Sequence, residues 1–230
     1  MKKFVLIVAG GSGSRMGTDT PKQFLELCGK PLLMHTIQAF YDFNPDSEFI
    51  LVLPKAQQEF WMDLCRQHTF SILHQVVSGG ETRFHSVQNG LSRINSEGIV
   101  FIHDGVRPLV SQETLKRCEE TARKSGNAIP VLAVTESLRK LEDDKSIAVD
   151  RSLFYSVQTP QTFLTGQIIN SYCQSYDSEF TDDASVVEKA GYPIYMVEGN
   201  RENIKITSPA DLIVAEALFG KALKIQDRNL

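Results

Sequence analysis

The residues best suited to chemistry in this sequence lie in a glycine-rich segment near its start, AGGSGSRMGTDTPKQF. This segment holds two cations, Arg15 and Lys22, and a single acid, Asp19. Glycines let backbone N–H groups approach an anion closely, and the two cations add positive charge around it. The combination indicates a site for a triphosphate and for a transition state that gains charge at phosphorus. Taken alone, the segment fits a tight turn with two solvated cations equally well.

The two common phosphate-binding loops do not fit this segment. A P-loop needs a Gly-Lys pair followed by Ser or Thr, which the sequence lacks. The dinucleotide fingerprint GxGxxG, started at Gly11, continues with Gly13 but has Met16 where its last glycine belongs. An acidic ribose ligand is also missing from its expected place about twenty residues further on.

A second candidate pair, Asp104 and Arg107, follows the apolar run IVFIH. Ligands of parallel sheets bind outside the carboxyl ends of strands, so we expect this acid near the glycine-rich segment. Asp104 suits Mg²⁺ or a ribose hydroxyl, and Arg107 suits a bidentate phosphate contact. The alternative is a plain turn, because Asp-Gly favours one and Arg-Pro ends it. His103 is interpreted as structural, since it ends a buried run.

Two further segments supply candidates. GGETRFHSV places Gly80, Glu81 and Ser86 between a strand and a helix, where backbone groups and a hydroxyl can contact the edge of a base. A turn with helix-capping residues explains the same segment at least as well. Lys205 is expected near the end of a strand in NIKIT, and an exposed lysine without a function is its alternative.

No residues are spaced as a nucleophile with its base or as a metal cluster. Neither a Ser-His-Asp nor a Cys-His arrangement stands out, and the histidines have no metal-ligand spacing. A phosphate that attacks another phosphate is already an anion and needs no general base. Such a reaction needs positioning, Mg²⁺ and cations, which the candidates above supply.

The elements that would hold these residues alternate between short apolar runs and segments of helical period. This alternation predicts an α/β fold of the Rossmann-like type, a mostly parallel sheet flanked by helices. Strands are expected at 4–9, 49–54, 73–80, 98–103, 128–134, 192–199 and 202–207, and helices at 30–43, 60–68, 81–94, 113–126 and 208–223.

Residues 135–152 interrupt the alternation. Their sequence, TESLRKLEDDKSIAVDRS, predicts two short strands around a polar turn from Glu142 to Ser146. We expect this β-hairpin to project as an arm from a single domain spanning 1–230. A projecting arm is suited to contact between two copies of a chain.

The composition limits the class of partner. A net charge of −4 over 230 residues argues against a general nucleic-acid binder, and four scattered cysteines argue against a disulfide framework or a zinc site. The apolar run from Phe4 to Ala9 is too short for a secretory leader, and no stretch is long enough to span a membrane. The sequence therefore predicts a cytoplasmic protein that binds neither nucleic acid nor a membrane.

Taken in order, several motifs resemble those of the 2-C-methyl-D-erythritol 4-phosphate cytidylyltransferases. They are AGGSGSRMGTDTPKQF, GGETRFHSV, HDGVRP, VDRSLFYSVQTPQTF, FTDDAS and GNRENIKITSPADL, and they extend from the first strand to the last helix. The resemblance implies a nucleotidyltransferase fold whose arm forms a homodimer. It also implies that CTP and methylerythritol phosphate react, with Mg²⁺, to give the cytidine diphosphate product and pyrophosphate in the non-mevalonate isoprenoid pathway.

The resemblance assigns each candidate residue a role by matching motifs. The residues that act on the reacting phosphates would be Arg15, Lys22 and Lys205. The CTP contacts would be Ala9, Gly10, Gly11, Gly13, Gly80, Glu81, Ser86 and Asp104, with Asp104 also a ligand of a magnesium ion held mainly by the CTP phosphates. The acceptor contacts would be Arg107, Ser137, Arg151, Thr159 and Thr181, some of them from the partner's arm.

Three other functions are compatible with parts of this pattern. Ribitol 5-phosphate cytidylyltransferases share the loop, PKQF, the Asp…Arg-Pro turn and TPQ, and a methyl-sized pocket discriminates by only about 1–3 kcal/mol. A non-catalytic sugar-nucleotide-binding module would keep GGE but could lose Lys22 or Lys205, and both are present. An NAD(P)-dependent dehydrogenase is disfavoured by the broken GxGxxG.

Overall fold

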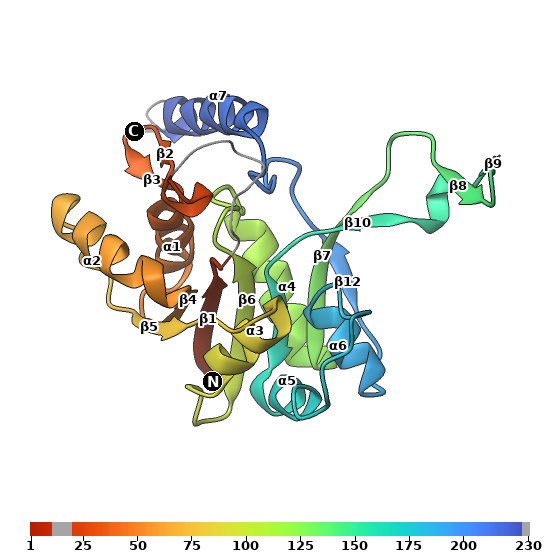
Figure 1. Ribbon diagram of the computed structural model, residues 1–230, viewed down its shortest axis with the longest axis horizontal. Helices are drawn as coiled ribbons and strands as arrows, with labels where there is room; N and C mark the ends of the chain where they lie inside the picture. Colours follow the sequence, from red (N-terminus) through yellow and green to blue (C-terminus); the bar gives the residue numbers. More distant parts are fainter. Residues whose placement is uncertain (11–19, 227–230) are drawn as a thin grey trace.

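The computed structural model describes residues 1–10 and 20–226, with side chains as far as residue 220. Its centre is a mixed, mostly parallel eight-stranded sheet in the order β10-β7-β11-β6-β1-β4-β5, with β12 paired to β7 (Figure 1). The strands are β1 Lys2–Val8, β4 Glu48–Leu53, β5 Gln75–Ser78, β6 Gly98–Asp104, β7 Asn127–Ala133, β10 Tyr155–Val157, β11 Gln161–Leu164 and β12 Met196–Glu198.

The two central strands are buried on both faces, which explains their continuous apolar runs. Phe4 and Leu6 of β1 belong to one core cluster, whereas Val5 and Ile7 belong to the cluster on the opposite face. β1 and β6 are parallel, and Val8 stands opposite Asp104. The segments that follow these two strands therefore begin side by side.

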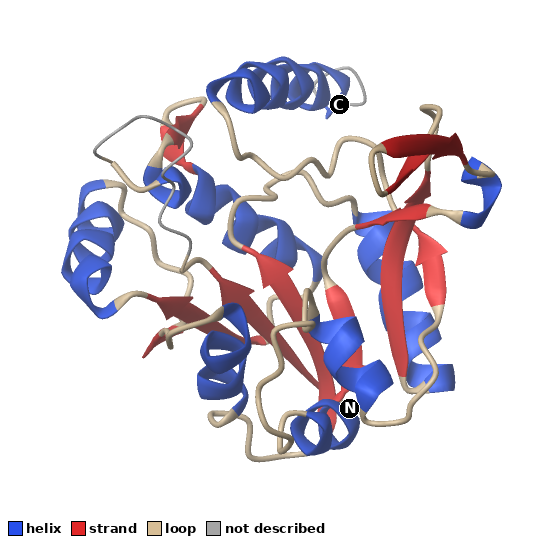
Figure 2. Cartoon of the chain, turned by 45° about the vertical axis from the view of Figure 1, so that its right-hand side comes forward, coloured by secondary structure: helices blue, strands red, loops and turns tan. Residues whose placement is uncertain are grey.

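Helices cover both faces of the sheet (Figure 2). Residues of α1 (Leu32–Phe43), α2 (Gln58–Gln67) and α4 (Gln112–Ser125) pack into one cluster. Residues of α3 (Arg83–Leu91), α5 (Thr165–Ser171) and α6 (Asp183–Lys189) pack into the other. The last helix, α7 (Pro209–Gln226), packs near the short strands β2 (Glu26–Leu27) and β3 (Lys30–Pro31). None of the helices within the described residues is long and apolar enough to cross a membrane.

The predicted hairpin is confirmed as β8 (Arg139–Glu142) and β9 (Lys145–Ala148). Asp143 turns the chain between them in the left-handed region, at φ 50°. The hairpin projects from the body of the molecule (Figure 1). Its apolar side chains are exposed. Leu141 is 72% exposed and Ile147 is 44% exposed.

The predicted α/β sheet is confirmed, but one expected strand is wrong. Residues 202–207 form a loop rather than a strand. The Ile206 N–H donates to the Val106 carbonyl oxygen at 3.0 Å, and this bond ties the loop to the turn after β6 rather than to a neighbouring strand. The apolar alternation of NIKIT therefore reflects packing of Ile204 and Ile206 against the cluster that includes Leu27 and Ala215, not membership of a sheet.

Candidate active site

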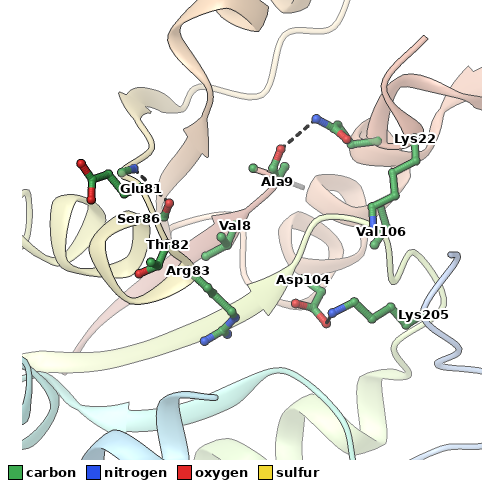
Figure 3. A pocket seen from close by; sticks show the side chains of 13 residues that line it. Val8, Ala9, Lys22, Glu81, Thr82, Arg83, Ser86, Asp104, Val106 and Lys205 are labelled. Atoms are coloured by element: carbon green, nitrogen blue, oxygen red, sulfur yellow. Dashed lines mark hydrogen bonds and ion pairs between the residues drawn. The ribbon is translucent and has the colours of Figure 1, made fainter. Parts of the chain in front are cut away.

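A cavity of about 240 Å³ lies at the carboxyl ends of the parallel strands (Figure 3). The segments after β1, β5 and β6 line it, together with Lys22, Gln23 and Lys205. The sheet holds these segments in register beyond the strand ends. The Gly105 N–H donates to the Val8 carbonyl at 2.9 Å, and the Ala9 N–H donates to the Val52 carbonyl at 3.0 Å.

The turn before α3 is closely packed around Gly80. Its N–H donates to the Ser86 hydroxyl at 3.0 Å, which leaves the hydroxyl proton available to a ligand. A Cβ atom at Gly80 would lie 2.4 Å from the Cβ of His85, so only glycine fits there without a shift of the helix. Thr82 caps the helix by accepting from the His85 N–H. Glu81 also lines the cavity, so the predicted base-binding residues do come together.

Asp104 is the charged centre of the site. Its Oδ2 accepts from Lys205 Nζ at 3.1 Å and from Arg107 Nε at 3.0 Å. The side chain is 11% exposed, and burial alone would raise its pKa. The surrounding cations, Lys205 before Arg83 and Arg107, outweigh burial and hold the pKa of Asp104 well below its usual range. The carboxylate is therefore ionised at any physiological pH.

His103 and Thr159 fix the backbone of Asp104 through a chain of hydrogen bonds. The Asp104 N–H donates to Thr159 Oγ1 at 3.1 Å, and that hydroxyl donates to His103 Nδ1 at 3.0 Å. His103 Nε2 donates to the Arg107 carbonyl at 3.0 Å, and burial lowers the His103 pKa to about 4, so the ring is neutral. The structural interpretation of His103 is confirmed. Thr159, predicted to contact the acceptor, has a hydroxyl already engaged in positioning Asp104.

A second cavity of about 300 Å³ adjoins the first and shares Arg83, Asp104 and Lys205 with it. Three of the predicted acceptor residues, Arg107, Thr159 and Thr181, line this second cavity. Arg107 is only partly available to a ligand, since its Nη1 also donates to the Asn203 carbonyl at 2.8 Å.

The other two predicted acceptor residues are not brought to either cavity. Ser137 and Arg151 belong to the exposed arm, where Arg151 Nη1 donates to the Thr135 carbonyl. A single chain therefore does not assemble the full set of predicted acceptor contacts. The order of the motifs carries no sign of this, because the projection of the arm separates these residues from the sheet edge.

Lys22 lies in a 3-10 turn, η2 (Lys22–Phe24), that is fixed on both sides. Gln23 is 1% exposed, and its Nε2 donates to the Ala9 carbonyl at 2.8 Å and to Gln57 Oε1 at 2.6 Å. Phe24 stacks on Trp61 of α2 with ring centroids 6.1 Å apart. Lys22 therefore enters the cavity from a rigid base. The predicted Gly11, Gly13 and Arg15 lie outside the described residues.

Several residues that line the cavities were not predicted as site residues, and two of them, Gln23 and Arg83, are held by specific hydrogen bonds. Gln23 is a plain amide within PKQF, and nothing in the sequence distinguishes it as the residue that holds the Ala9 carbonyl. Arg83 pairs with Asp183 a hundred residues away, Nη2 to Oδ2 at 2.6 Å. A contact over that separation becomes visible only once the two helices are placed.

A mostly parallel sheet, with cations gathered around Asp104 where two cavities adjoin at its carboxyl edge, is typical of a nucleotidyltransferase. The chain belongs to the 2-C-methyl-D-erythritol 4-phosphate cytidylyltransferase family, whose model matches residues 3–221. The enzyme of that name from Bacteroides thetaiotaomicron is 53% identical over 219 residues, covering 95% of this chain and all of the relative. The Bacteroides fragilis enzyme is 54% identical over 221 residues, covering 95% of this chain and all of the relative.

Solved structures of such enzymes have the same fold. The 4-diphosphocytidyl-2C-methyl-D-erythritol synthase of Anaerococcus prevotii superposes with a TM-score of 0.80 at 28% identity, covering 95% of this chain and 96% of that one. The 2-C-methyl-D-erythritol 4-phosphate cytidylyltransferase of Thermus thermophilus gives 0.77 at 34% identity, covering 95% and 98%. The fold and the family expected from the sequence are confirmed.

Proposed function

We propose that this chain transfers the cytidylyl group of CTP to 2-C-methyl-D-erythritol 4-phosphate, in the non-mevalonate pathway to isoprenoid precursors. An oxygen of the acceptor phosphate attacks the α-phosphorus of CTP, the bond from that phosphorus to the β-phosphate oxygen breaks, and pyrophosphate leaves. The observation that carries the proposal is that two cavities meet at Asp104 and Lys205, in a chain of this family. Such a junction places two phosphates in contact for an in-line reaction.

The residues of the first cavity suit CTP. The Gly80 carbonyl and the Ser86 hydroxyl would offer hydrogen bonds to cytosine, and the Gly10 N–H would offer one to the triphosphate. Lys22, with Arg15, balances the charge that develops on the phosphates in the transition state. Lys205 lines both cavities and lies beside Asp104 (Figure 3), so it would stand where nucleotide and acceptor meet.

Magnesium fits the donor set of this site. Within the described residues, no group of three or more His, Cys, Asp or Glu is arranged to hold a metal. Mg²⁺ prefers substrate phosphates together with one or two carboxylates, and Asp104 is such a carboxylate. Both ion pairs of Asp104 end on Oδ2, so Oδ1 is the oxygen that we assign to the metal. The bound ion would neutralise phosphate charge during the transfer.

We further propose that the arm completes the acceptor site of a second copy. Ser137 and Arg151 lie on the arm, away from the cavities of their own chain, and Leu141 and Ile147 expose apolar surface there. A homodimer that buries this surface would bring the two polar residues to the partner's second cavity. The single-domain organisation with 135–152 as the dimerisation arm, and the cytoplasmic location, stay predictions.

Pyrophosphate release tests the proposal. The protein is incubated with CTP, Mg²⁺ and either methylerythritol phosphate or ribitol 5-phosphate. We expect release with the first acceptor; release only with the second would overturn the substrate, and none with either would overturn the function. Lys22→Met should lower turnover by about 10²–10³-fold. The control Lys30→Met changes an exposed lysine and should leave turnover unchanged.

A further inference from the structure

Arg83, the first residue of α3, lines both cavities. Its Nη1 donates to Asp183 Oδ1 at 2.8 Å and its Nη2 donates to Oδ2 at 2.6 Å. Asp183 is completely buried, and the Tyr172 hydroxyl donates to the same Oδ1 at 2.7 Å. Two parallel hydrogen bonds to one carboxylate fix the plane of the guanidinium as well as its position.

The ion pair with Asp183 leaves some N–H donors of the Arg83 guanidinium available to a ligand. Burial lowers the pKa of Arg83, but the neighbouring Asp183 carboxylate outweighs it and raises the pKa, so the side chain stays charged. A guanidinium has five N–H groups, of which Asp183 takes two. The side chain is 30% exposed although its partner is 0% exposed. Donors therefore remain on the side of the residue that forms the cavity wall.

The pair also joins the two substrate segments. Arg83 follows directly on the Gly80–Thr82 turn of the first cavity, and Asp183 follows on Thr181 and Asp182 of the second. Aromatic packing supports this connection, since the ring of Phe84 stacks on that of Tyr172 with centroids 4.7 Å apart. Arg83 and Lys205 approach Asp104 from opposite sides (Figure 3).

We propose that Arg83 is a further catalytic residue, whose remaining N–H groups bind the phosphate oxygens where CTP and acceptor meet. Asp183 and Tyr172 are positioning residues, which hold the guanidinium in place before substrate arrives. The inference rests on the proposed function. Its physical reason is that negative charge moves across this junction as one P–O bond forms and the other breaks, and a fixed cation lowers that barrier.

The alternative is an ion pair that serves only to hold α3 and α6 together. Removing Arg83 alone would not distinguish a catalytic role from a structural one, because it leaves a buried carboxylate without its partner and lowers stability. The double variant Arg83→Gln with Asp183→Asn replaces the charged pair by a neutral hydrogen-bonded pair. It restores polar pairing without restoring the guanidinium, and so separates stability from catalysis.

The test measures kcat, KM for each substrate and melting temperature for the wild type, Arg83→Gln and the double variant. Arg93→Gln, which changes an exposed arginine in the turn after α3, is the matched control. We expect the melting temperature to fall in Arg83→Gln and to recover in the double variant. We expect kcat to fall by about 100-fold in both, with the control unchanged.

Recovery of kcat together with the melting temperature in the double variant would overturn the catalytic role and leave the proposed function intact. No turnover by the wild type would overturn the proposed function and this inference with it. Should the double variant not fold, Arg83→Lys tests the catalytic role instead. It keeps the positive charge beside Asp183 but loses the planar guanidinium with its paired N–H donors. We expect at least a tenfold lower kcat at a near-normal melting temperature, and an unchanged kcat would overturn the proposal.

Discussion

The geometry of the site predicts the effect of the substitution Asp104→Asn on both stability and turnover. The substitution keeps the shape of the side chain but removes the charge that pairs with Lys205 and Arg107 through Oδ2. It also removes the carboxylate that we assign to magnesium. The change therefore acts on both stability and turnover, and the structure gives a separate reason for each.

The expected loss of stability follows from how exposed the two partners are. Removing one member of a buried charge pair costs about 3–5 kcal/mol. Arg107 is 12% exposed and its side chain stays buried, whereas Lys205 is 43% exposed and can turn into water. An amide oxygen at position 104 still accepts from Arg107, which lowers the cost to the bottom of that range or just below it, at about 2–3 kcal/mol. For a chain of this size the melting temperature should fall by about 4–12 °C.

Thermal unfolding followed by circular dichroism measures this loss, and pyrophosphate release measures turnover. We expect kcat to fall by about 10²–10³-fold, because a preorganised charge at the reacting phosphates is lost. The matched control is Glu48→Gln, which breaks an ion pair with Lys2 at the sheet surface. It should change neither quantity appreciably. A melting temperature for Asp104→Asn as high as that of the control, or wild-type turnover, would refute the reasoning.

Three further predictions follow from the same structure. In Gly80→Ala the new Cβ would lie 2.4 Å from the Cβ of His85, so the start of α3 must shift. The KM for CTP should rise by about tenfold while the KM for the acceptor stays the same. An unchanged KM for CTP would contradict the assigned base site. Leu141→Glu, on the arm, should convert dimer to monomer in sedimentation velocity, whereas Lys124→Glu on α4 should not; a dimeric Leu141→Glu protein would argue against the arm as interface. Because the Asp104 pKa is depressed in the folded state, its stabilisation is fully present above the ordinary value of 3.8 and shrinks as the pH falls from there toward the folded-state pKa. Urea unfolding should therefore show a difference between wild type and Asp104→Asn that is constant from pH 8 to about pH 5 and narrows below about pH 4, and a constant difference at all pH values would contradict the shift.

Much of the fold follows from local sequence. The runs at 4–9 and 99–102 are apolar without interruption, as is typical of strands buried on both faces, and the structure places them side by side in β1 and β6. Since both strands are parallel and in register, Asp104 and the two residues that directly follow β1, Ala9 and Gly10, lie at one edge of the sheet. The arm is equally local, since EDDKS is a polar turn between two strand-like runs.

The parts that sequence could not supply depend on distant contacts. Arg83 and Asp183 meet across a hundred residues, and neither side chain differs in type from a solvated surface residue. The loop containing Lys205 reads as a strand in the sequence because apolar alternation looks the same in a buried loop and in a sheet. Motif matching groups Ser137 and Arg151 with the acceptor residues, and only the projection of the arm shows that a single chain keeps them apart.

Transfer of label from CTP tests the central claim, that one site joins the α-phosphorus of CTP to the acceptor phosphate. The protein would be given CTP labelled on the α-phosphorus, Mg²⁺ and methylerythritol phosphate, with Lys205→Met in parallel. We expect label to appear in the cytidine diphosphate product and not in the pyrophosphate, and Lys205→Met to lose most of this transfer. Label released as CMP without attachment to the acceptor, or transfer unaffected by Lys205→Met, would contradict it.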